Sequence, residues 1–95
     1  DPRTVTAMAA LLQDPVVAVR TATLRAMAST GDGSAMEPIA TGLEDDDKTV
    51  RQVAIDALVT LNQKGAAPLL TAYADKEGDK ALADAAREAA AKLSR

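Results

Sequence analysis

The feature that most constrains the fold of this chain is an internal repeat. The segment Leu12–Arg20 returns 31 positions later as Leu43–Arg51. The apolar register that follows is also kept, because Ala22, Ala26 and Met27 correspond to Val53, Ala57 and Leu58. Self-similarity at this period is typical of a solenoid in which helix pairs stack on one another. The repeat therefore predicts an all-α fold, a right-handed α-solenoid of three helical hairpins and six helices.

Composition limits the functions that are possible for the 95-residue chain, which contains no Cys and no His. These two absences remove thiolate chemistry, the usual general base near neutral pH and the commonest metal ligand. We therefore expect no catalytic site, no cofactor, no bound metal and no enzymatic activity. The net charge of −3 and the lack of a basic stripe argue against a nucleic-acid partner. The chain has no apolar run long enough to span a membrane, and the absence of Cys suggests a cytoplasmic location.

Six amphipathic segments are separated by short breakers. The pattern predicts helices over about 3–13, 17–29, 34–43, 48–61, 66–74 and 80–93. Asp47 and Asp79 are expected N-caps, whereas Val16 is a poor one. The segment Asn62–Gly65 is expected to close the fourth helix, with Lys64 and then Gly65 as the typical ending. Four further placements are expected: Ala22 and Ala26 facing inward, Pro68 matching Pro38 at a shift of 30, and Tyr73 in the position of Leu43.

An Asp followed six positions later by an Arg marks the turn of the first two repeats. The pairs are Asp14 with Arg20 and Asp45 with Arg51, each Arg preceded by Val. This pattern resembles the HEAT repeat, in particular its short phycobilin-lyase-like variety, over essentially the whole chain. The resemblance implies repeats at about 1–31, 32–64 and 65–95 in a single domain. It also implies that these Asp and Arg residues form an ion-pair ladder between the turns of adjacent repeats.

The third repeat departs from this pattern. Ala83 replaces the Arg, and Arg87 stands where the first two repeats have Leu24 and Ile55, which are suited to packing on a following repeat. A polar residue at such a position is typical of a capping repeat. The segment 1–3 resembles an ordinary inter-repeat loop. We therefore expect the chain to be the C-terminal part of a longer protein, with upstream repeats among its partners.

The outward positions of the second helices form the predicted partner-binding surface. Two rows cross the repeats, Thr21–Gln52–Asp84 and Arg25–Asp56–Glu88. Their charge changes from basic to acidic along the array, which favours a partner with a basic patch. The alternative is an ordinary solvated surface. The cluster 44–47 could attract a hard cation, but it lacks EF-hand spacing, and a structural role for Asp45 and Asp47 is preferred.

The favoured function is a non-catalytic protein-interaction or scaffold module that uses the concave face of the array. The alternative is an accessory or regulatory domain of a larger enzyme, such as the lyase-type subunits that this repeat variety resembles. Nucleic-acid binding is a third hypothesis, and the negative net charge argues against it.

Overall fold

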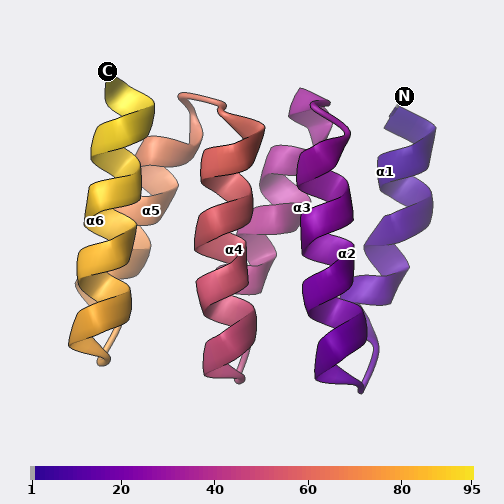
Figure 1. The fold of residues 1–95 in the computed structure, drawn as a ribbon, viewed down its shortest axis with the longest axis horizontal. Helices are drawn as coiled ribbons and strands as arrows, with labels where there is room; N and C mark the ends of the chain where they lie inside the picture. The colour runs from indigo at the N-terminus through magenta and orange to yellow at the C-terminus, as the bar shows by residue number, and fades with distance from the viewer. Residues whose placement is uncertain (1) are drawn as a thin grey trace.

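The chain folds into two layers of helices in a computed structural model that describes residues 2–95. Asp1, the first residue of the expected inter-repeat segment, lies outside the described residues. The second helices α2, α4 and α6 run side by side, with α3 and α5 behind them and α1 flanking α2 (Figure 1). The Cα atoms span 32 × 29 × 15 Å. The all-α solenoid predicted from the 31-residue period is confirmed.

The first hairpin consists of α1 (Pro2–Ala9), a 3₁₀ turn (Ala10–Gln13) and α2 (Val17–Ser29). The chain leaves helical geometry at Asp14, as expected for a residue that precedes proline. Val16 gives α2 no side-chain cap, as predicted. Instead, the Asp14 carboxylate accepts a hydrogen bond from the Val16 amide at 2.8 Å. After α2 the chain turns at Gly31, whose φ of +66° favours glycine.

The second hairpin contains a 3₁₀ turn (Gly33–Ala35), α3 (Met36–Thr41), a second 3₁₀ turn (Gly42–Glu44) and α4 (Lys48–Leu61). The third contains α5 (Ala66–Lys76) and α6 (Lys80–Ser94). The predicted N-caps are confirmed, since the Asp47 carboxylate accepts from the Thr49 amide and that of Asp79 from the Leu82 amide. The predicted end of α4 after Leu61 is confirmed, but Asn62, at φ 59°, closes the helix in place of the expected Gly65, because asparagine tolerates the left-handed conformation.

The core is built from small and medium apolar side chains of all three hairpins, and Leu24 and Ile55 are almost completely buried in it. A Cβ atom placed on Gly42 would lie 3.0 Å from the Ala54 Cβ and 3.1 and 3.2 Å from the two δ carbons of Leu24. Leu24 thus packs on the second repeat, as predicted. Glycine at position 42 is what allows the two repeats to approach this closely.

The prediction that Ala22 and Ala26 face inward is wrong, because both are exposed. Their counterparts one repeat later, Val53 and Ala57, are buried. The difference arises from position in the array. Ala22 and Ala26 lie on the side of α2 that faces away from the second repeat, and no helix of residues 2–95 covers them.

The predicted register of the third repeat is also wrong for its first helix. Burial repeats at a shift of 31, since Ile39 and Leu70 are both fully buried, whereas Leu69 is 37 % exposed. Tyr73 therefore corresponds to Gly42 rather than to Leu43. The match of Pro68 with Pro38 suggested a shift of 30. A proline near a helix start fixes local geometry, however, and does not determine which face of the helix is buried.

Candidate functional site

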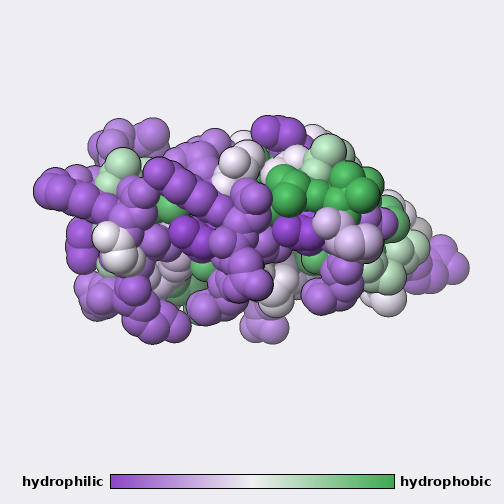
Figure 2. Space-filling model, turned by 90° about the horizontal axis from the view of Figure 1, so that it is seen from below, coloured by the Kyte–Doolittle hydropathy of each residue, from purple (hydrophilic) through white to green (hydrophobic). Residues whose placement is uncertain are grey.

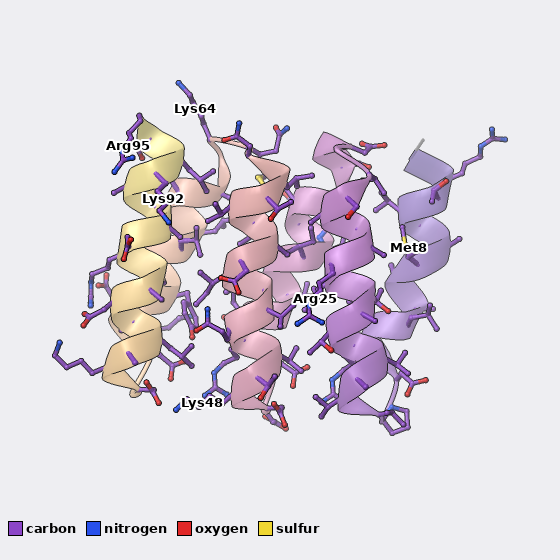
Figure 3. All side chains as sticks on the ribbon, viewed as in Figure 1. Met8, Arg25, Lys48, Lys64, Lys92 and Arg95 are labelled. Atoms are coloured by element: carbon purple, nitrogen blue, oxygen red, sulfur yellow. The ribbon has the colours of Figure 1, made fainter. Side chains whose placement is uncertain are left out.

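The outward side of the second-helix layer carries the predicted row Arg25–Asp56–Glu88. All three residues are exposed and lie on α2, α4 and α6 respectively. Figure 3 shows Arg25 extending from α2 toward α4. Gln52 donates a hydrogen bond to the Asp56 carboxylate at 3.2 Å, which orients that acid on its helix. The row changes from basic on α2 to acidic on α4 and α6.

The other predicted row, Thr21–Gln52–Asp84, does not form a continuous surface. Thr21 is only 7 % exposed, and its hydroxyl donates to the Ala18 carbonyl at 3.1 Å. The expected outward exposure of Thr21 is wrong, because its short side chain turns back on its own helix. Asp84 is exposed, and its carboxylate lies 2.7 Å from the Lys80 ammonium, which lowers the pKa of Asp84.

A groove of about 340 Å³ runs between α4 and α6. Its apolar lining comes from Ile55, Val59, Ala85 and Ala89, and its polar lining from Asp56, Thr60, Glu88 and Lys92. Two predicted site residues, Asp56 and Glu88, thus meet at one groove, with the Lys92 ammonium 3.8 Å from the Glu88 carboxylate. Sequence analysis missed Val59, Thr60 and Lys92. The four-residue spacing of Val59, Thr60 and Lys92 from the helix positions already identified was the signal that could have found them.

Arg20 joins the first two repeats. Its Nε lies 2.9 Å from Asp45 Oδ2, and one of its terminal nitrogens lies 3.2 Å from Asp45 Oδ1. Its other terminal nitrogen donates to the Asp14 backbone carbonyl at 2.7 Å. The partner of the Arg20 guanidinium in its own turn is therefore a carbonyl group, and the Asp14 carboxylate takes no part in this contact. Arg20 therefore binds both its own turn, through the Asp14 carbonyl group, and the turn of the next repeat, through the Asp45 carboxylate.

Arg51 makes the corresponding connection to the third repeat. Two carbonyl groups of its own turn, those of Asp45 and Asp46, accept hydrogen bonds from its guanidinium at 2.9 and 3.0 Å. Its Nε lies 3.0 Å from Glu77 Oε2, in ionic contact without the alignment of a hydrogen bond. Glu77 was missed by sequence analysis, because the expected acid was aspartate. Its spacing from Asp79 repeats that of Asp45 from Asp47, and this was the available signal.

Glu77 is also bound by the only tyrosine of the chain. The Tyr73 hydroxyl donates to Glu77 Oε2 at 2.6 Å, and the Asp79 amide donates to Glu77 Oε1 at 3.0 Å. These bonds, led by that of the tyrosine and assisted by Arg51, lower the pKa of Glu77. Burial raises the pKa of Tyr73 from 10.0 to about 12, and the hydrogen bond to Glu77 acts in the same direction.

The repeated turn and the hairpins it joins agree with the comparison of the sequence with known families. Residues 4–91 match the family described as HEAT repeats. The chain belongs to the HEAT repeat family. HEAT repeats in general are modules of protein–protein interaction. A comparison with curated proteins found no match.

The acidic segment 44–47 of this HEAT domain has structural contacts at three of its four side chains. Asp45 pairs with Arg20, and Asp47 caps α4. Glu44 lies 3.5 Å from the ammonium of Lys76. Among the helices of residues 2–95, none has the length and hydropathy of a membrane span.

Proposed function

We propose that this HEAT domain is a non-catalytic interaction or scaffold module that binds a partner protein along α2, α4 and α6. The groove between α4 and α6 is the centre of the proposed surface. The observation that carries the proposal is its mixed lining, in which apolar side chains of both helices lie beside Asp56 and Glu88. Such a surface suits an amphipathic segment with apolar and basic side chains.

The contacts around the groove support this choice of partner. Lys92 lies 3.8 Å from Glu88, so this acid is only loosely paired. Asp56 accepts one hydrogen bond, from the neutral amide of Gln52. A basic side chain of a partner would therefore meet two carboxylates and one ammonium group. Arg25 on α2 extends the same surface and would face an acidic group of the partner.

The test places a photo-crosslinking amino acid at Thr60, which lines the groove. The matched control carries it at Thr71, which is exposed on α5 in the other helix layer. A partner from lysate of the source organism should be crosslinked through position 60 and not through position 71. The substitutions Asp56→Lys and Glu88→Lys should abolish that product without lowering the melting temperature. Equal crosslinking at both positions would contradict the proposed surface.

Three finer statements belong to the same proposal. The chain itself carries no catalytic site, which its lack of His and Cys supports. Its location is cytoplasmic, which the lack of Cys supports. The alternative function, an accessory domain of a larger enzyme, has only the resemblance of the turns to the short phycobilin-lyase-like repeats in its favour.

A further inference from the structure

The junction between α4 and α6 is more open than the junction between α2 and α4. α4 packs against α2 over more of its length than against α6, and α6 stands farther from α4 than α2 does in Figure 1. On α4, Val53 is buried. Its counterpart on α6, Ala85, is half-buried and lines the groove of about 340 Å³. The smaller side chain at position 85 therefore leaves space that a valine fills one repeat earlier.

The groove also places two like charges at the same level of the array. Asp56 and Glu88 occupy equivalent positions of α4 and α6, and both line the groove. At the preceding junction the equivalent pair is Arg25 and Asp56, whose charges are opposite. Lys92, which lies near the C-terminal end of α6 in Figure 3, approaches Glu88 only to 3.8 Å. A cation that enters between the two acids is attracted by both.

The walls of the groove favour a helical partner over an extended one. The residues that line it lie inside α4 and α6, where the backbone amide groups donate within their own helices. An extended segment would find no backbone ladder there, whereas a helix satisfies its own backbone groups. Apolar and polar side chains also recur at four-residue spacing on both walls, which is the spacing of side chains on one face of a partner helix. The repeated pairs are Ile55 and Val59, Asp56 and Thr60, Ala85 and Ala89, and Glu88 and Lys92.

We propose that the groove is the docking site of an amphipathic α-helix of the partner protein. This helix covers Ala85 and Ala89 with an apolar side chain and places one lysine or arginine between Asp56 and Glu88. The inference rests on the proposed function and deepens it, because it names the conformation of the bound segment and the residue that opens its site. On the face shown in Figure 2, polar side chains cover most of the α4–α6 part of the molecule, and apolar ones gather at the α1–α2 end. The apolar contact of the docked helix is therefore confined to the floor of the groove.

The first experiment uses a synthetic peptide as the probe. The peptide is an alanine-based helix that carries two leucines four residues apart and one arginine between them. Its binding to the complete chain is followed at low ionic strength through the methyl NMR signals of Val59 and Ala89, both of which should shift. Replacement of the peptide's arginine by glutamine should weaken binding about tenfold. A peptide with proline at its centre, which breaks the helix, should not bind.

Two substitutions in the chain test the two parts of the site. Ala85→Val introduces the side chain that closes the preceding junction and should weaken binding of the arginine peptide about tenfold. The matched control is Ala81→Val, which makes the same change at an exposed position of α6, at a similar cost in helix propensity, and should leave binding unchanged. Glu88→Gln keeps the shape of the wall and should reduce binding of the arginine peptide toward that of the glutamine peptide. Circular dichroism verifies that the three variants are folded.

Several results would overturn the inference. They are unshifted Val59 and Ala89 signals at millimolar peptide, binding that survives Ala85→Val, and equal binding of the arginine, glutamine and proline peptides. Crosslinking through position 60 separates such a failure from failure of the proposed function. A partner whose crosslinking is unchanged by Ala85→Val would leave the interaction surface standing and overturn the helical docking. The absence of any crosslink through position 60 would overturn the proposed function and this inference with it.

Discussion

Replacing Arg20 by methionine tests whether the contact between the turns stabilises the HEAT domain. Methionine keeps an apolar stem and removes every donor of the guanidinium. The change deletes the contacts to Asp45 at 2.9 and 3.2 Å and the bond to the Asp14 carbonyl at 2.7 Å. The side chains of Arg20 and Asp45 are only 16 % and 14 % exposed, so solvent screens this pair weakly.

The expected magnitude follows from these contacts. A hydrogen bond to a charged group contributes about 1.5–3 kcal/mol, and removing one partner of a buried ion pair costs about 3–5 kcal/mol. Three bonds that share one side chain are not additive, and the Asp45 carboxylate keeps its bond from the Asp47 amide. We therefore expect Arg20→Met to lower the free energy of unfolding by about 3 kcal/mol.

The assay is urea unfolding followed by circular dichroism, in a double-mutant cycle of Arg20→Met with Asp45→Asn. We expect a coupling energy of about 1–2 kcal/mol. The matched control is the pair Lys80–Asp84, which is shorter at 2.7 Å but has side chains that are 88 % and 55 % exposed. The control pair should show no measurable coupling. Equal coupling in the two cycles would refute the argument, because it would show that burial does not decide the strength of these ion pairs.

Three further predictions concern the packing and titration of the repeats. Gly42→Ala should lower the free energy of unfolding by about 1–2 kcal/mol in urea titrations, because overpacking against Leu24 exceeds the gain in helix propensity; Gly33→Ala, whose Cβ would meet only Gln63 at 3.5 Å, should be neutral or stabilising. The ultraviolet absorbance of the chain should report tyrosinate formation near pH 12, and a midpoint near 10 while circular dichroism still shows the folded state would contradict the buried bond of Tyr73. Glu77 has a lowered pKa in the folded state, so its contribution to stability is present above its unfolded pKa of about 4.5 and is lost as the pH falls through the folded value. Glu77→Gln should therefore reduce the decrease in the free energy of unfolding as the pH falls into the acidic range. A decrease equal to that of the unmodified chain would contradict this reasoning.

The helices and their order could be predicted from the sequence because local chemistry specifies them. Asp47 and Asp79 are capping residues directly before apolar periodic segments, and they cap α4 and α6 in the structure. The bounds of α2 were likewise predictable from the breakers on either side of it. The 3₁₀ turns at Ala10–Gln13 and Gly42–Glu44 were not predicted. Their amphipathic pattern continues that of the preceding helix, so the pattern does not distinguish them from an α-helical turn.

Which side chains are buried was harder to predict, because burial depends on neighbours. Ala26 and Ala57 occupy equivalent positions in successive repeats, yet the first is exposed and the second is buried. Thr21 was assigned to the surface because it faces away from the predicted apolar stripe of its helix, but it is buried and its hydroxyl donates to a carbonyl of its own helix. The residues of the groove between α4 and α6 come from two repeats, and a reading of each helix alone could not bring Val59 and Lys92 together.

The direction in which each arginine reaches has a consequence for partial unfolding. Detachment of the first hairpin would remove Arg20 and leave the Asp45 carboxylate without its guanidinium partner. Detachment of the third would remove Glu77 and leave the Arg51 guanidinium, which stays charged at every accessible pH. Acid weakens the junction with the third hairpin, because the pKa of Glu77 is lowered in the folded state and its ionic contact with Arg51 is lost once Glu77 is protonated. As the pH falls, the array should therefore open more readily at the junction between its second and third hairpins.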